Sequence, residues 1–202
     1  MTVMKKCFSV IMLGLLISLA ACSASRAQIF SDNFETDTTF NTSLWTSVKG
    51  DPIIFTHRLL LQSTPGNGCD ATSIPTFLYR EVQIQTPSYA WSEDTSIGFE
   101  TWSPSHCGVV VTNGCLGIIN HQIAGTISDQ ESYIPIPNWS TLWTGDNTYL
   151  IQWTSGTVNL YINGVFSCSY SGPKVPSVYA NVRMNSSNDH YDNLQVAYCD
   201  VY

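Results

Sequence analysis

Charged residues are scarce in this chain, and basic residues are the scarcest of them. Lys and Arg account for 8 of the 202 residues, against 15 Asp and Glu, and all four types together make up only 11% of the chain. A basic patch for the phosphates of a nucleic acid cannot be assembled from so few, which argues against DNA and RNA as partners. The composition also argues against a disordered chain, because six Trp, ten Tyr and eight Phe supply ample apolar area for the core of one domain.

The chain also lacks an apolar run long enough to span a bilayer, which takes about 20 residues. Its longest such run, from Val10 to Ala21, follows Lys5 and Lys6. A basic start followed by a short apolar run is typical of a signal peptide. We therefore expect a leader over residues 1–27 and a single domain over residues 28–202, secreted or displayed at the cell surface.

The sequence offers two candidate cleavage sites at the end of this leader. Leu19 to Cys22, with the letters LAAC, resembles a bacterial lipobox and predicts an outer-membrane lipoprotein whose only membrane contact is a lipid on Cys22. Ser25 to Ala27 would instead suit ordinary signal peptidase, and Cys22 would then be removed with the leader.

The cysteines lack the paired spacing of a zinc site, so disulfides are the expected use in an exported domain. Their pairing stays open, except that Asn113-Gly114 predicts a hairpin turn that places Cys107 far along its strand from Cys115. The five cysteines beyond the leader are Cys69, Cys107, Cys115, Cys168 and Cys199.

Helical periodicity is missing, and short alternating apolar runs take its place. Tyr149, Ile151 and Trp153 alternate with polar residues, and Asn163-Gly164 predicts a second hairpin turn further on. Many short strands separated by Gly, Pro, Asn and Ser predict an all-β fold, an antiparallel β-sandwich of the jelly-roll type.

Three stretches, taken in order, resemble the concanavalin A-like lectin/glucanase superfamily. They are FSDNFETDTTFNTSLWTSV near the start, YLIQWTSGTVNLYINGVFSCSYSG in the late hairpin and HYDNLQVAYCDVY at the end. The superfamily includes glycoside hydrolase family sixteen, laminin-G-like modules, legume-type lectins and several polysaccharide lyases. The resemblance thus implies a concanavalin A-like jelly roll and a polysaccharide or glycan partner, and it leaves the chemistry open.

The same resemblance implies a structural calcium ion between the first and last strands. Glu35, or Asp32 beside it, and Asp192 are the matching oxygen donors. No cofactor is required by any of the functions considered.

The stretch TSIGFETW, from Thr95 to Trp102, is where the resemblance places the functional strand. Alternation sends Ile97 and Phe99 to the core and Gly98, Glu100 and Trp102 to the opposite face, which we expect to form the floor of a groove. Family sixteen carries Glu-x-Asp-x-x-Glu at this place. Glu100 matches no register of that motif, because its partners would be Trp102 and Ser105, Gly98 and Ser103, or Ile97 and Thr95.

A lone carboxylate beside an aromatic residue favours glycan binding without catalysis. The leading hypothesis is therefore an exported, lectin-like carbohydrate-binding domain, with ligand contacts from Glu100, Trp102, His106, His121 and Trp91. The first alternative is a divergent, beta-glucanase-like glycoside hydrolase that uses Glu100 with a carboxylate from elsewhere, such as Glu131 on an expected loop. Two further alternatives remain. One is a polysaccharide lyase, in which Arg80, Gln83 and Gln85 neutralise the substrate and His106, His121 or a tyrosine is the base. The other is a structural or adhesive surface protein.

Overall fold

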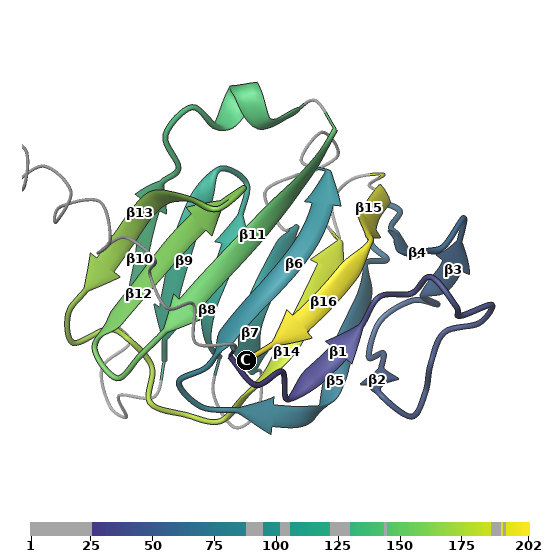
Figure 1. The fold of residues 1–202 in the computed structure, drawn as a ribbon, viewed down its shortest axis with the longest axis horizontal. Helices are drawn as coiled ribbons and strands as arrows, with labels where there is room; N and C mark the ends of the chain where they lie inside the picture. The colour runs from purple at the N-terminus through teal and green to yellow at the C-terminus, as the bar shows by residue number, and fades with distance from the viewer. Residues whose placement is uncertain are drawn as a thin grey trace, which may run out of the picture.

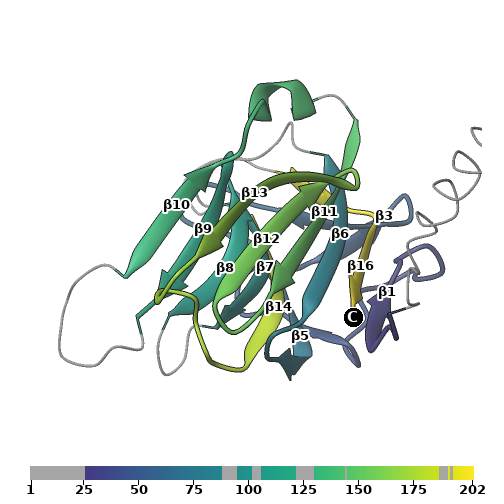
Figure 2. The ribbon, with the colours of Figure 1, turned by 60° about the vertical axis from the view of Figure 1, so that its left-hand side comes forward.

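The computed structural model describes residues 26–87, 95–101, 106–121, 130–143, 145–186, 191 and 193–202. Two antiparallel sheets pack face to face, with a small third sheet beside them (Figures 1 and 2). The prediction of an all-β antiparallel sandwich is confirmed. Among the described residues, no helix has the length and apolar character needed to cross a membrane.

The sheet nearest the viewer in Figure 1, here called the front sheet, has six strands. In spatial order they are β1 (Phe30–Asp32), β16 (Tyr198–Val201), β6 (Glu81–Pro87), β11 (Asp146–Trp153), β12 (Thr157–Ile162) and β13 (Val165–Ser171).

The sheet behind it, here called the back sheet, has seven strands. In spatial order they are β10 (Glu131–Pro135), β9 (Cys115–Asn120), β8 (Cys107–Thr112), β7 (Ser96–Thr101), β14 (Ala180–Ser186), β5 (Cys69–Phe77) and β2 (Trp45–Thr46). The small sheet contains β15 (Asn193–Val196), β4 (Arg58–Gln62) and β3 (Ile53–Phe55), and a 3-10 helix, η1 (Trp139–Trp143), lies between β10 and β11.

The core lies between the front and back sheets and follows from the alternation of the strands. In β11 the buried positions include Tyr149, Ile151 and Trp153, as the sequence predicts. Trp153 packs against Phe99 of the back sheet with ring centroids 5.3 Å apart, so aromatic contacts join the two layers.

Both predicted hairpin turns are confirmed. In the β8–β9 pair Thr112 lies opposite Cys115 and Cys107 lies opposite Asn120, and Asn163-Gly164 joins β12 to β13. The expected disulfides are not supported, because no bond joins any of the five cysteines that the structure describes. They are spread over β5, β8, β9, β13 and β16, and of these only β8 and β9 are neighbours in a sheet.

Several residues named from the sequence lie outside the described part of the chain. They are the leader as far as residue 25, with its lipobox, and Trp91, Trp102 and Asp192.

Candidate functional site

Strand β7 presents Glu100 on the outer face of the back sheet, away from the core. Ile97 and Phe99 are fully buried in the core, and Glu100 points the opposite way, as the alternation predicts. Gly98 has a positive φ of 146°, and a Cβ there would lie 2.4 Å from the carbonyl oxygen of Val109. Close approach of the β8 backbone therefore explains this glycine.

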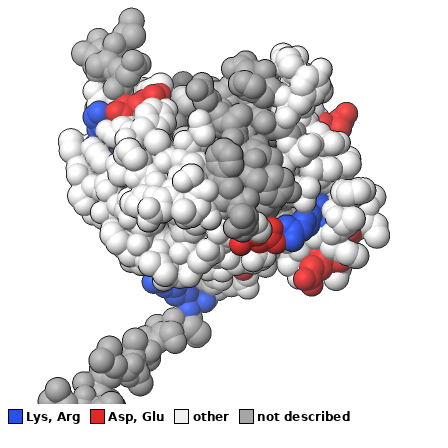
Figure 3. All heavy atoms as spheres, turned by 90° about the horizontal axis from the view of Figure 1, so that it is seen from above, with Lys and Arg blue, Asp and Glu red and all other residues white. Residues whose placement is uncertain are grey.

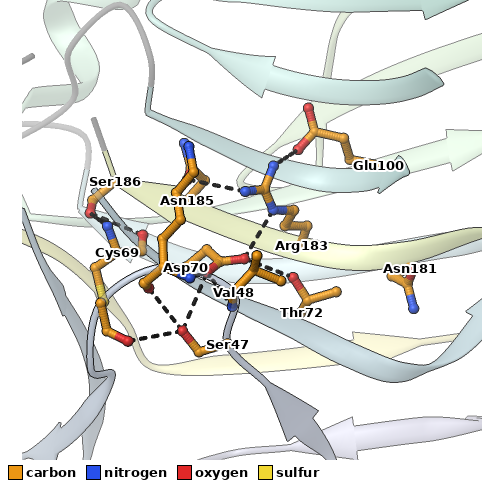
Figure 4. Close-up of polar contacts among 12 residues, drawn as sticks. Ser47, Val48, Cys69, Asp70, Thr72, Glu100, Asn181, Arg183, Asn185 and Ser186 are labelled. Atoms are coloured by element: carbon orange, nitrogen blue, oxygen red, sulfur yellow. Dashed lines mark hydrogen bonds and ion pairs between the residues drawn. The ribbon is translucent and has the colours of Figure 1, made fainter. Parts of the chain in front are cut away.

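Arg183 on β14 binds Glu100 from one side. Strand β14 pairs with β7 so that Asn181 is opposite Glu100 and Arg183 is opposite Gly98. Arg183 Nη1 donates to Glu100 Oε2 at 2.7 Å, and Arg183 Nε donates to Asp70 Oδ2 at 3.2 Å (Figure 4). One guanidinium thus joins carboxylates from β7 and β5 across three adjacent strands.

Asp70 is held in place by several hydrogen bonds and in turn anchors Arg183. It is fully buried, and its Oδ1 accepts backbone N–H groups of Val48 at 2.9 Å and Lys49 at 2.7 Å (Figure 4). The Thr72 hydroxyl donates to Oδ2 at 3.0 Å. Because these bonds consume its acceptor capacity, Asp70 anchors Arg183 and is not available for chemistry.

His106 binds Glu100 from the other side. Its Nε2 lies 2.9 Å from Glu100 Oε1, and Glu100 is only 5% exposed. Burial alone would raise the pKa of Glu100, but the hydrogen bond from His106 and the charge and hydrogen bond of Arg183 outweigh it and lower that pKa. Glu100 is therefore ionised at neutral pH and cannot donate a proton there.

A second group of polar residues lies on the same face at β10. Glu131 begins that strand, which corrects the expectation that it sits on a loop. Its Oε1 lies 3.0 Å from His121 Nε2, and its Oε2 accepts the Tyr133 hydroxyl at 3.0 Å. Burial, helped by this bond to Glu131, raises the pKa of Tyr133 to about 12, so the phenol stays protonated as a donor.

The two groups meet at the ends of the β8–β9 hairpin. His121 N donates to the His106 carbonyl at 3.1 Å, and the two imidazole rings stand edge to face with centroids 5.4 Å apart. One ligand atom each from His106, His121 and Glu131 lies within 4.8 Å of the others. The outer face thus carries two carboxylates, Glu100 and Glu131, each bound to an imidazole, with the two imidazoles between them.

The residues that would neutralise the substrate in the lyase alternative are not brought to this face, although its candidate bases His106 and His121 are. Arg80 directly precedes β6, and Gln83 and Gln85 lie on that strand in the front sheet. Gln83 donates there to the Tyr198 hydroxyl at 2.7 Å. The structure therefore separates these groups from His106 and His121.

The calcium site that the resemblance implies stays a prediction. Asp32 is buried and accepts the Trp45 indole N–H at 2.7 Å and the Phe34 backbone N–H at 3.0 Å. Glu35 is exposed, and the matching Asp192 lies outside the described residues.

Arg183 and Asp70 are the residues of this face that sequence reasoning missed. Arg183 falls in ANVRMNS, where Ala180, Val182 and Met184 alternate as core residues and place the Arg on the outer face. A basic residue in the middle of a strand, in a chain with so few of them, was a signal of an ion pair. Nothing local indicated that its partners would come from β5 and β7.

Comparison with known proteins places this geometry in a known fold. No family model matches the chain, and no curated protein does. Among solved structures, the beta-glucanase of Bacillus licheniformis superimposes with a TM-score of 0.67 over 88% of this chain and 98% of that one, at 11% identity.

Two further solved structures give the same result. A structure described as Crh5 transglycosylase in complex with NAG has a TM-score of 0.61 at 13% identity, over 85% of this chain and 82% of that one. A laminarinase from Flavobacterium sp. UMI-01 has a TM-score of 0.58 at 11% identity, over 87% of this chain and all 100% of that one. The chain shares the jelly-roll fold of these solved structures, which is the fold that its sequence motifs predict.

These neighbours correct the leading functional hypothesis. The sequence favoured a lectin-like domain without catalysis, because Glu100 was the only carboxylate evident on its strand. The solved structures reported above are glucanases and a transglycosylase, and Glu131 supplies a second carboxylate on the same face. The hypothesis of a non-catalytic binding domain is therefore wrong, and the glycoside hydrolase alternative is favoured.

Proposed function

We propose that this protein is a divergent glycoside hydrolase that cleaves a beta-glucan or a related glycan on the outer face of the back sheet. The observation that carries the proposal is Glu100, an ionised carboxylate buried at the sheet surface and held from both sides by Arg183 and His106. The glucanase and laminarinase neighbours support the substrate class.

Glycoside hydrolysis needs an ionised carboxylate and a proton donor on opposite sides of the scissile bond. Glu100 supplies the first, as nucleophile or as base for water, because its lowered pKa keeps it charged. Glu131 is the second carboxylate of this face, and with His121 it is the candidate source of the proton for the leaving oxygen. The glycosidic C–O bond breaks, and water adds to the anomeric carbon.

Binding of the sugar would use the polar side chains around these groups. Tyr133 keeps its proton and lies over Gly117, where an added Cβ would come within 3.2 Å of its ring. The glycine leaves room for the phenol ring to pack on the sheet, and half of the Tyr133 surface stays exposed. Such a ring offers a sugar both an apolar surface and a hydroxyl.

The proposed export and anchoring rest on the leader. We propose that Cys22 carries a lipid, and labelling of cells with radioactive palmitate tests it. Label in the wild-type protein and none in Cys22→Ala supports the anchor, whereas equal label in both contradicts it.

The activity is tested by reducing-end release from a panel that contains beta-1,3-glucan, beta-1,3-1,4-glucan and mucin-type glycans. We expect release from at least one of them. Replacement of the carboxylate in Glu100→Gln should lower that rate by at least about a hundredfold, as for the loss of a group that acts in acid–base or nucleophilic catalysis.

Asp51→Asn is the matched control, because it makes the same carboxylate-to-amide change at an exposed residue outside the proposed site. It should keep the wild-type rate. Absence of release from every glycan, or a Glu100→Gln rate within threefold of the control, would overturn the proposed function.

A further inference from the structure

We propose that His106, His121 and Glu131 form a binding site for a divalent transition-metal ion, with zinc as the first choice. Within the described part of the chain they are the only three residues of ligating type gathered closely enough to share an ion. Two imidazoles and one carboxylate are a ligand set that zinc accepts, with a fourth position for water.

The scaffold holds the three ligands at one end of three adjacent strands. His106 directly precedes β8, His121 directly follows β9, and Glu131 is the first residue of β10. Backbone hydrogen bonds fix this end, from His121 N to His106 O at 3.1 Å and from Asn120 N to Gln130 O at 3.1 Å. The ligands are thus carried by paired strand ends rather than by independent loops.

The ligand atoms are near the spacing that a metal requires. They lie within 4.8 Å of one another, whereas the ligands of a tetrahedral zinc ion lie about 3.3 Å apart. The side chains of His121 and Glu131 are 36% and 27% exposed, so rotation of these side chains can close the difference and solvent can deliver the ion.

Neighbouring residues already orient the ligands as they do in metal sites. Glu100 Oε1 lies 2.9 Å from His106 Nε2, and the Tyr133 hydroxyl donates to Glu131 Oε2 at 3.0 Å. Metal-bound imidazoles and carboxylates usually make such second contacts, which fix the tautomer and the ring orientation.

The chemistry of the donors selects the class of ion. Imidazole nitrogen binds zinc, copper and nickel well, whereas calcium and magnesium prefer six or more oxygen ligands. We therefore expect zinc, nickel and copper to bind here and calcium and magnesium not to. This site is separate from the calcium site that the sequence motifs imply near Glu35.

Binding of a metal ion at this site would affect catalysis, and this consequence rests on the proposed function. A bound ion would engage Glu131, the proposed partner of Glu100, and would therefore inhibit glycan cleavage. Metal binding itself is measured without glycan, so that failure of one proposal can be told from failure of the other.

The test is isothermal titration of the EDTA-treated, reduced protein with zinc chloride, with the thermal unfolding midpoint as a second readout. We expect one zinc ion per chain, and a rise in Tm of about 5–10 °C when free zinc is a hundredfold above Kd. His121→Asn should weaken binding at least about tenfold, and Glu131→Gln should do likewise if the first variant fails to fold.

His57→Asn is the matched control, because His57 is exposed and its Nδ1 contacts the Glu35 carbonyl, outside the cluster. It should bind zinc like the wild type. A wild-type protein that shows no saturable zinc binding, or that binds zinc no more tightly than His121→Asn and Glu131→Gln, would overturn the proposal whether or not glycan is cleaved.

Discussion

At the residue scale, Arg183 is the link on which the site depends. It is 6% exposed and pairs with two buried carboxylates, Glu100 and Asp70. A buried charge pair stabilises a fold only while both partners are present, since the loss of one leaves the others without compensation in a poorly hydrated environment. Arg183 therefore helps to fix the position of Glu100 and, together with His106, keeps that carboxylate charged.

Replacing this guanidinium tests its structural role. Arg183→Met keeps an apolar stem of similar length but removes the guanidinium that two buried carboxylates share, so we expect a loss of about 3–5 kcal/mol of unfolding free energy in urea. Arg58→Met is the control, because Arg58 pairs with Asp146 at the surface, where both side chains are nearly a third exposed. The control should lose no more than about 1 kcal/mol, and equal losses in the two variants would refute a special role for Arg183.

The lowered pKa of Glu100 predicts a pH dependence of stability. A carboxyl group whose pKa is lower in the folded protein stabilises the fold above its unfolded pKa of about 4.3, and this contribution is lost as the pH falls through the folded value. Glu100→Gln should therefore be less stable than wild type at pH 7, and the gap should narrow below pH 4. Urea midpoints measured at the two pH values check this, and a gap that widens in acid contradicts it.

At the element scale, the β8–β9 hairpin positions the imidazoles. Its Asn113-Gly114 turn fixes the register, and that register brings His106 and His121 together at the open end. Gly114 has a φ of 78°, and a Cβ there would lie 3.0 Å from the Trp139 ring of η1. The turn therefore needs glycine both for its backbone and for the packing of η1.

The two Asn-Gly turns allow these causes to be separated. Gly164 has a φ of 77° in the β12–β13 turn, but a Cβ there meets nothing within 4 Å. Gly164→Ala should cost about 1 kcal/mol from backbone strain alone, whereas Gly114→Ala should cost about 2 kcal/mol. Thermal or urea unfolding of both variants measures the difference in unfolding free energy. Equal losses would mean that the Trp139 ring moves away from the new methyl group without loss of stability.

Local patterns predicted this hairpin and the two faces of β7, but they did not predict the partners of Glu100. Alternation and Asn-Gly turns act over a few residues, so they could be recognised in the sequence. The contact with Arg183 depends on β14 lying between β5 and β7, which is a long-range arrangement that no local pattern encodes. Glu131 was expected on a loop, and its pairing with β9 became visible only in the fold.

At the scale of the whole molecule, the sandwich explains why the search for a catalytic motif on one strand failed. The second carboxylate of the proposed site comes from β10, at the edge of the back sheet, rather than from β7. A glycosidase needs two carboxyl groups at a suitable separation in space, not at a fixed spacing in sequence. The fold could therefore be predicted from superfamily motifs, whereas the composition of the site could not.

The most direct test is a crystal structure of the Glu100→Gln variant soaked with an oligosaccharide from the panel. The account predicts a sugar ring on the outer face of the back sheet, with a glycosidic bond within hydrogen-bonding distance of the side chain at position 100 and the ring of Tyr133 nearby. A sugar bound instead on the outer face of the front sheet, with the position-100 side chain still enclosed by Arg183 and His106, would contradict it.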